Sequence, residues 1–226
     1  MNLLDLVFPK NCLECHREGK YLCSGCVSKV SRALPLCLER MKPSIDGVTY
    51  VKCQKKYGID GLISVWEYQG IIRKAILSLK FKYSTEVGRE LTESLIKALK
   101  VSSSLFMIPD SSVLVPIPLH WHRENVRGFN QSIEVGKSVA VALNWKFIPD
   151  LLIKKQQTIS QVELGGQKRR QNLKNVFSVN PNYVRNTLHS VLIFDDVATT
   201  GSTLREAAKV LKRNGAEKVW GLTIAR

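Results

Sequence analysis

From residue 61 onward, two hydrophobic periodicities alternate along the chain. Within 71–80, apolar positions 72, 75, 76 and 79 share one face at helical spacing, whereas short apolar runs with β-branched residues predict buried strands. The predicted strands are 63–68, 112–118, 146–153, 191–194 and 218–226, and the predicted helices are 71–80, 85–100, 131–143 and 204–211. This alternation predicts an α/β fold with a mainly parallel sheet flanked by helices, and a ligand beyond the carboxyl ends of the strands.

The stretch 191–203 changes abruptly from apolar residues to two acids and then to a hydroxyl-rich loop with a glycine. A loop followed by a helix leaves backbone N–H groups unpaired, and together with the helix dipole these favour a phosphate. Asp195 and Asp196 would repel a phosphate, but they suit sugar hydroxyls or Mg²⁺. The stretch therefore predicts a sugar-phosphate site. The alternative is an ordinary turn and helix cap, which we disfavour because two acids at a buried strand end are costly without a ligand.

Two further segments carry many polar side chains that suit phosphate binding. The segment 120–131 follows a predicted strand and is rich in arginine, histidine and asparagine, which suits a pyrophosphate. We expect Arg127 and Gly128 to take part, and we interpret His120 and His122 as a solvated basic turn. The segment 154–174 is too long for a simple connection and predicts a mobile lid. Alternatively, its bases Lys168, Arg169 and Arg170 hold nucleic-acid phosphates.

The cysteines divide the chain by composition. All six lie in 1–58 and none in 59–226, so we expect a small cysteine-rich domain followed by a larger α/β domain with a boundary at 58/59. Two C-x-x-C pairs are separated by a short segment that predicts a tight turn at 17–20. Their four thiolates suit a tetrahedral Zn²⁺. The expected ligands are Cys12, Cys15, Cys23 and Cys26.

Other uses of these cysteines are disfavoured. The first pair with His16 matches a haem-attachment pattern, but haem attachment requires export and no signal peptide is evident. A redox-active C-x-x-C pair is disfavoured because no predicted strand precedes either pair. Disulfides are disfavoured because we expect a reducing compartment. His16 in place of one thiolate stays open. Cys37 and Cys53 begin what would be two more pairs, but their partners are Arg40 and Lys56. Either a second metal site is lost, or Cys37 and Cys53 complete a site with one of the C-x-x-C pairs and the other pair is idle. We favour the loss of the second site, because the two C-x-x-C pairs are close in sequence and bring four ligands together at a lower entropy cost.

The charge of the chain favours polyanionic partners. Lys and Arg number 34 against 19 Asp and Glu, a formal net charge of +15 with a pI near 9.7. Such an excess indicates contact with nucleic acid, although a basic enzyme that attracts phosphorylated substrates is the alternative. No apolar run approaches the roughly 18 residues of a membrane helix, and we expect no transmembrane segment and a cytoplasmic location.

The loop residues carry a resemblance to a known family. The stretch 191–203 resembles the phosphoribosyl-pyrophosphate (PRPP) signature of type I phosphoribosyltransferases, with four apolar residues, two acids, two small or apolar residues and Thr-Thr-Gly-Ser-Thr. With 115–118, 127–131 and 170–177, the chain resembles the ComF/GntX family of competence-associated, phosphoribosyltransferase-like proteins over essentially its whole length. It departs from the family pattern in the half-missing second cysteine set, so one zinc is expected.

This resemblance implies a type I phosphoribosyltransferase-like domain behind an N-terminal zinc ribbon, with PRPP bound together with Mg²⁺. The implied PRPP-binding residues are Arg127, Gly128, Asp195, Asp196, Ala198, Thr199, Thr200, Gly201, Ser202 and Thr203. The 5′-phosphate would lie on the hydroxyl loop, the ribose at the two acids and the pyrophosphate near Arg127.

Two functions follow from these patterns. We favour a protein that binds PRPP or a nucleotide and acts in DNA uptake and natural transformation, with other DNA-uptake proteins as partners and a location at the inner membrane through them. It would bind single-stranded DNA through Lys154, Lys155, Lys168, Arg169 and Arg170. The alternative is an enzyme that transfers phosphoribosyl from PRPP to a base, although no base-specificity segment is identifiable and catalytic residues stay unassigned.

Overall fold

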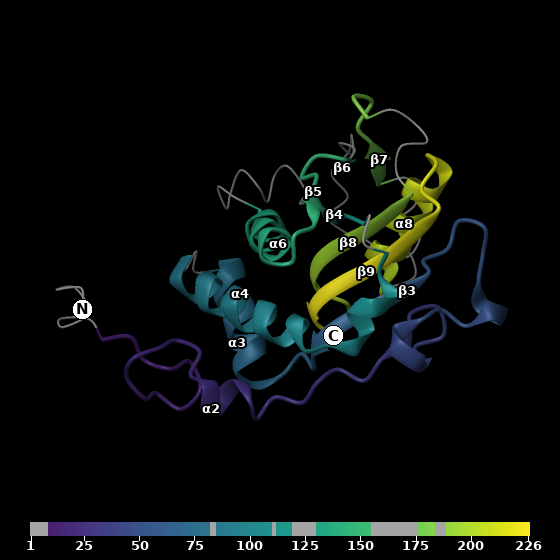
Figure 1. The fold of residues 1–226 in the computed structure, drawn as a ribbon. Coiled ribbons are helices and arrows are strands. Elements are labelled where there is room, and N and C mark those ends of the chain that lie inside the picture. Colours follow the sequence, from purple (N-terminus) through teal and green to yellow (C-terminus); the bar gives the residue numbers. More distant parts are fainter. Residues whose placement is uncertain (1–8, 82–84, 110–111, 119–129, 155–175, 184–188) are drawn as a thin grey trace, which may run out of the picture.

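A sheet of five parallel strands forms the centre of the computed structural model, which describes residues 9–81, 85–109, 112–118, 130–154, 176–183 and 189–226 (Figure 1). The strand order is β3-β9-β8-β4-β5, and each neighbouring pair is parallel. The strands are β3 (Gly61–Trp66), β4 (Val113–Pro116), β5 (Lys146–Phe147), β8 (Ser190–Val197) and β9 (Lys218–Ala225). The predicted α/β class with a mainly parallel sheet is confirmed.

Helices cover both faces of this sheet. Successive strand residues point to opposite faces, so Leu192 and Phe194 of β8 join a buried cluster with α3 and α4, whereas Val191 and Ile193 join a second cluster with α8. The helices are α3 (Gly70–Phe81), α4 (Thr85–Lys100), α6 (Gln131–Ala142) and α8 (Ser202–Arg213), with a short 3₁₀ helix η3 (Ser103–Met107) after α4. Figure 1 shows α3, α4 and α6 on one side of the sheet and α8 on the other. None of the described helices has the length and apolar composition that a bilayer-spanning segment requires.

Most predicted elements agree with the structure, and one is wrong. The helix predicted at 85–100 coincides with α4, and the helix predicted at 71–80 is one residue longer at each end. The strand predicted at 146–153 is instead two short strands, β5 and β6 (Leu152–Lys154), and β6 pairs antiparallel with β7 (Phe177–Val179) in a separate sheet. Pro149 stands in the turn between them, where its missing N–H cannot continue a ladder.

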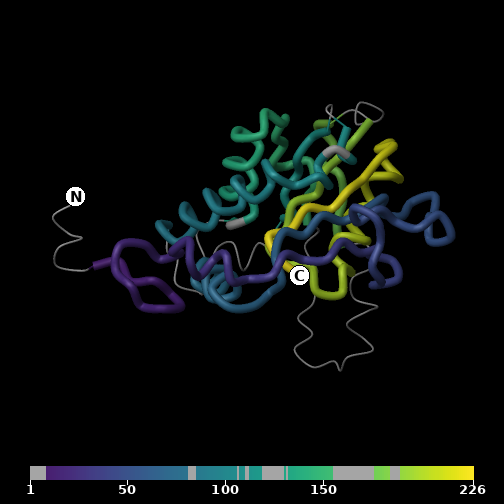
Figure 2. The backbone as a smooth tube through the Cα atoms, turned by 60° about the horizontal axis from the view of Figure 1, so that its bottom comes forward, coloured from purple at the N-terminus to yellow at the C-terminus, as the bar shows by residue number. Residues whose placement is uncertain are grey.

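The cysteine-rich segment runs along the flank of the molecule (Figure 2). It contains α2 (Ser24–Val27), the antiparallel pair β1 (Leu36–Cys37) and β2 (Lys42–Pro43), and the 3₁₀ turns η1 (Ile45–Gly47) and η2 (Val51–Cys53). Its residues share the two clusters that cover the sheet: Leu22 packs with the α3 and α4 side, and Leu38 with the α8 side. The boundary at 58/59 remains a prediction, and the two portions share buried surface.

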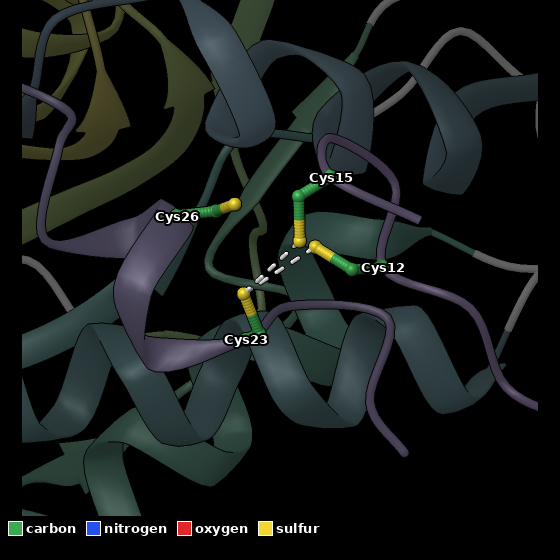
Figure 3. A group of neighbouring side chains, drawn as sticks. All are labelled: Cys12, Cys15, Cys23 and Cys26. Atoms are coloured by element: carbon green, nitrogen blue, oxygen red, sulfur yellow. Dashed lines mark hydrogen bonds between the residues drawn. The ribbon is translucent and has the colours of Figure 1, made fainter. Parts of the chain in front are cut away.

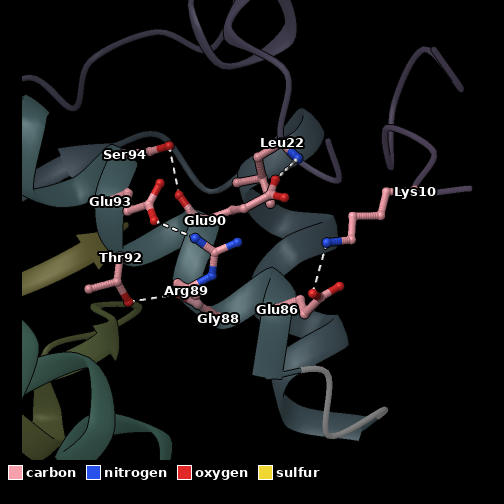
Figure 4. A network of polar contacts seen from close by, with 9 residues as sticks. All are labelled: Lys10, Leu22, Glu86, Gly88, Arg89, Glu90, Thr92, Glu93 and Ser94. Atoms are coloured by element: carbon pink, nitrogen blue, oxygen red, sulfur yellow. Dashed lines mark hydrogen bonds and ion pairs between the residues drawn. The ribbon is translucent and has the colours of Figure 1, made fainter. Parts of the chain in front are cut away.

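Polar contacts also attach this segment to α4 (Figure 4). The Lys10 ammonium lies 2.8 Å from the Glu86 carboxylate, and the Leu22 N–H donates to the Glu90 carboxylate at 2.8 Å. Glu90 is buried, and a charge taken out of water is costly unless it accepts hydrogen bonds. The Leu22 N–H therefore satisfies a buried carboxylate and holds the cysteine region on the helix.

Candidate functional site

The carboxyl end of β8 brings the two acids and the hydroxyl loop together, as the sequence predicted. The strand is longer than expected: it continues past the apolar residues through Val197, because β9 still pairs with it, Asp195 lying opposite Thr223. The Ala198 N–H then donates to the Ala225 carbonyl at 3.0 Å, and α8 begins at Ser202. The strand, loop and helix arrangement is confirmed, while the PRPP-binding role of its residues remains a prediction.

Gly201 sets the shape of the loop. Its φ of 68° lies in the left-handed region, and it is the cap residue of α8. A Cβ at this position would lie 2.3 Å from Leu38 Cδ1, closer than real contacts allow. Only glycine meets both requirements here, because it tolerates positive φ and has no Cβ.

The hydroxyl groups of the loop are partly engaged with one another. The hydroxyls of Thr200 and Ser202 lie 3.0 Å apart in a hydrogen bond, and the Ser202 N–H approaches Thr200 Oγ1 at 3.4 Å. Thr199 and Thr200 are exposed, whereas Ser202 and Thr203 are half-buried. The loop thus presents hydroxyl and N–H donors at a helix N-terminus, which is the chemistry of an anion site.

Burial and neighbouring charges control the ionisation of Asp195. Burial of the carboxyl and the neighbouring charge of Asp196 raise the pKa of Asp195 to about 7, against the opposing effects of a hydrogen bond from the Asp196 N–H at 2.9 Å and the charges of Lys80 and Lys154. Asp196 forms an ion pair of 2.7 Å with Lys80, and both side chains are mostly buried. At pH 7 Asp195 is therefore only partly ionised without a ligand, and the Lys80 ammonium offsets the charge of Asp196.

Lys80 was not among the site residues predicted from the sequence. It stands in the last turn of α3, and β8 lies more than a hundred residues later in the sequence, so only the packing of α3 on the sheet brings the two together. The available signal was a lysine ending a helix that follows a strand, which many proteins contain without any functional role. Lys80 supplies a built-in counter-ion for the candidate ribose and Mg²⁺ residues.

Replacing Lys80 with methionine should lower the free energy of unfolding of the ligand-free protein by about 1–2 kcal/mol at pH 8, because Asp196 loses its cationic partner. Urea denaturation measures this change. Lys74→Met is the matched control on the same helix, because its ion pair with Glu14 is exposed and such pairs contribute no more than about 1 kcal/mol. Equal losses in the two variants would remove the special role of Lys80.

Several predicted residues lie outside the described part of the chain: Arg127, Gly128, Lys155, Lys168, Arg169 and Arg170. Lys154 is described at the end of β6, and its charge acts on Asp195. One base of the predicted DNA-binding set therefore lies within electrostatic reach of the acid pair.

The four predicted zinc ligands come together in the cysteine-rich segment (Figure 3). Their ligand atoms all lie within 4.8 Å of one another, with Cys12 Sγ 3.6 Å and Cys15 Sγ 3.8 Å from Cys23 Sγ. Four thiolates about 2.3 Å from a tetrahedral zinc are about 3.8 Å apart, so the donor set fits this metal. The cluster consists of the cysteines without His16.

The close approach of the four thiols changes the pKa values of two of them. Burial acts to raise the pKa of Cys12, but hydrogen bonds from the backbone of Cys15, Cys23 and Glu14 outweigh it and lower that pKa to about 6. The pKa of Cys26 is raised, first by its hydrogen bond with Cys23 and then by burial. Without a cation the four thiols resist full ionisation, and a bound Zn²⁺ would relieve that repulsion.

The other two cysteines form no such cluster. Cys37 is fully buried, and burial together with the nearby Cys37 thiol raises the pKa of Cys53. Glu39 and Lys55, which follow the two cysteines by two residues each, form an ion pair of 2.9 Å. Within the described residues, no group of three or more potential ligands includes Cys37 or Cys53.

Comparison with known proteins gives both relatives and structural neighbours. Competence protein F of Haemophilus influenzae is 29% identical over 231 residues, which covers 96% of this chain and 98% of that protein. DNA utilization protein YhgH of Salmonella typhimurium is 32% identical over 209 residues, 89% of each chain. Competence protein ComFC of Bacillus subtilis is 28% identical over 170 residues, 72% of this chain and 63% of that one. No protein-family model matches the chain.

Solved structures of phosphoribosyl-handling enzymes are distant neighbours in fold. Glutamine PRPP amidotransferase from B. subtilis, complexed with ADP and GMP, is 20% identical with a TM-score of 0.40 over 61% of this chain and 26% of that one. Adenine phosphoribosyltransferase from Leishmania tarentolae is 14% identical with a TM-score of 0.35 over 65% of this chain and 74% of that one.

Proposed function

The chain belongs to the family of competence protein F, ComFC and DNA utilization protein YhgH, and from this premise we propose that it binds PRPP and single-stranded DNA and acts in DNA uptake and natural transformation. The names of these relatives support the role in DNA handling. The observation that carries the PRPP part is the meeting of two acids, a hydroxyl loop and a helix N-terminus at the end of β8.

In this proposal each part of PRPP has its own partner. The 5′-phosphate binds to the loop at 199–203, and the ribose hydroxyls donate to Asp195 and Asp196. The pyrophosphate lies near Arg127 and Gly128. Mg²⁺ fits the carboxylate oxygens of the acid pair and would offset the charge of the pyrophosphate.

Zinc has a structural role in the proposal. Cys12, Cys15, Cys23 and Cys26 hold one Zn²⁺, which cross-links a segment with few strands and helices of its own. Other DNA-uptake proteins are proposed partners, and a cytoplasmic location, at the inner membrane through those partners, completes the proposal.

One observation favours a second function, phosphoribosyl transfer to a base. A carboxyl whose pKa lies near 7, such as that of Asp195, is suited to accept and return a proton at neutral pH. Incubation with PRPP, Mg²⁺ and a panel of bases, followed by measurement of released pyrophosphate, tests this function. Release that depends on one base would establish the enzyme, and release with none would leave PRPP as a bound regulator.

Binding of single-stranded DNA should weaken steeply with salt. Each neutralised phosphate contributes a slope of about −0.7 in log K against log salt, so about five contacts predict roughly a hundredfold loss over a fourfold rise in salt. Replacing Lys168, Arg169 and Arg170 by alanine should lower both the affinity and the slope, as measured by gel-shift titration at two salt concentrations with and without PRPP.

A matched control removes the same charge elsewhere. Lys29, Lys97 and Lys100 are exposed, and their replacement by alanine should have a smaller effect on the slope. Binding that does not depend on salt, or no binding at low salt, would contradict the DNA-handling role. An unchanged DNA affinity after replacement of Lys168, Arg169 and Arg170 would mean that these three bases serve PRPP alone.

A further inference from the structure

We propose that Arg205 and Leu38 are positioning residues for the phosphate loop, so that the cysteine-rich segment forms part of the anion site. The inference rests on the proposed PRPP site. It concerns residues that neither touch the phosphate in the proposal nor belong to the motif.

Arg205 joins the loop to the cysteine-rich segment. One end of its guanidinium, Nη2, donates to the Thr200 carbonyl at 2.6 Å, and the other, Nη1, donates to the Leu38 carbonyl at 2.8 Å. Its own N–H donates to the Gly201 carbonyl at 2.9 Å in the first turn of α8. The planar fork of an arginine holds two acceptors in a defined geometry, which a lysine ammonium does not.

This contact controls the direction of a backbone donor. The Thr200 carbonyl and the Gly201 N–H belong to one planar peptide unit, and in a trans unit they point in opposite directions. By holding the carbonyl on its own side, Arg205 turns the Gly201 N–H toward the other side of the loop. A hydrogen bond to the carbonyl also polarises the peptide, which makes the N–H a stronger donor to an anion.

Leu38 supports the same peptide by packing. Its side chain is fully buried, and a Cβ on Gly201 would meet three Leu38 side-chain carbon atoms at 2.3, 2.7 and 3.0 Å. The left-handed Gly201 therefore rests directly on Leu38, which limits the movement of the loop in that direction.

Leu38 lies in the turn that begins at Cys37, one of the two cysteines outside the metal-ligand cluster. The Cys37 carbonyl accepts the N–H groups of Arg40 at 3.2 Å and Met41 at 2.8 Å. The chain therefore folds back here as it does at Cys23, whose carbonyl accepts the N–H groups three and four residues later. The ion pair between Glu39, whose side chain is only 9% exposed, and Lys55 ties this turn to the segment that carries Cys53. The turn at Cys37 thus has a structural role, because it supports the loop that contains Gly201.

The Thr200 to Gly201 peptide can be observed directly. It is the only Thr-Gly pair in the sequence, so protein labelled with ¹³C-carbonyl threonine and ¹⁵N glycine gives one carbonyl-to-amide NMR cross-peak from this peptide. Arg205→Lys keeps the charge and removes the fork. In the ligand-free protein we expect this cross-peak to shift, and we expect the affinity for ribose 5-phosphate, measured by calorimetry, to fall about tenfold.

Three further variants separate positioning from general damage. Arg213→Lys makes the same change at the other end of α8, where the guanidinium lies over the Tyr57 ring, and should leave the cross-peak and the affinity unchanged. Leu38→Ala should weaken binding and shift the cross-peak, whereas Leu38→Met, which conserves volume, should restore both toward wild type. A merely structural role would lower the melting temperature without this pattern of cross-peak and affinity.

The outcomes distinguish the two proposals. If the wild-type protein does not bind ribose 5-phosphate, the proposed PRPP site is wrong and the positioning role is overturned with it. If the wild type binds, and Arg205→Lys and Leu38→Ala bind equally well, the PRPP site stands and the positioning role is overturned.

Discussion

Replacing both Asp195 and Asp196 with asparagine should abolish PRPP binding while the fold stays intact. The ribose hydroxyls and Mg²⁺ lose their anionic partners, and asparagine binds Mg²⁺ far more weakly than a carboxylate does. The fold is retained because the amide oxygen introduced at position 195 can still accept the backbone N–H of the next residue, as the Asp195 carboxylate does at 2.9 Å. Calorimetric titration with PRPP and Mg²⁺ measures the loss.

The single variant Asp195→Asn should also stabilise the ligand-free protein at pH 8, by up to about 4 kcal/mol. The folded-state pKa of Asp195 is raised from its ordinary value to about 7, so between about pH 4 and pH 7 the folded state retains a proton that the unfolded state has lost. Stability from this group is therefore present below the unfolded pKa and is lost as the pH rises through about 7. Asparagine does not ionise and removes that loss.

Ligand binding should show the opposite pH trend. PRPP with Mg²⁺ requires the ionised acid, so the affinity of the wild-type protein should rise as the pH increases through about 7. Glu93→Gln, which changes an exposed carboxylate paired with Arg89 on α4, is the control and should leave both trends unchanged. Unchanged PRPP affinity in the double variant would refute the role of the acid pair.

Replacing Cys12 with serine should remove the zinc, which we expect at about one per chain, and unfold the cysteine-rich segment in preference to the sheet. Cys12 is fully buried within the cluster, and a hydroxyl does not replace a thiolate as a zinc ligand. Because zinc binding supplies folding free energy, we expect the free energy of unfolding of this segment to fall by at least about 3 kcal/mol. Metal analysis measures the zinc, and limited proteolysis should show new cleavage within 9–35 before the sheet is cut.

The matched control for the zinc prediction is Cys53→Ser, which changes a partly exposed cysteine outside the cluster. It should retain the metal and the wild-type proteolysis pattern. Two zincs per wild-type chain would contradict the assignment, as would full zinc retention in Cys23→Ser.

Features that depend on residues close together in the chain could be predicted from the sequence. The helices at 85–100 and 204–211 follow from apolar spacing, and the loop after β8 follows from the switch at Asp195. The cysteine cluster was also predictable, because two C-x-x-C pairs eleven residues apart bring four thiols together through short loops. These predictions succeeded because local spacing is sufficient to specify them.

Features that need partners far apart in the chain depend on the complete fold. The pKa of Asp195 depends on burial and on Lys80, which packing alone brings near it, and the strand predicted at 146–153 divides because its second half pairs with β7. Arg205 and Leu38 are separated by 167 positions, and no local pattern marks their contact. Side-chain burial, charge neighbours and strand pairing are set by the complete packing of the chain, which periodicity does not encode.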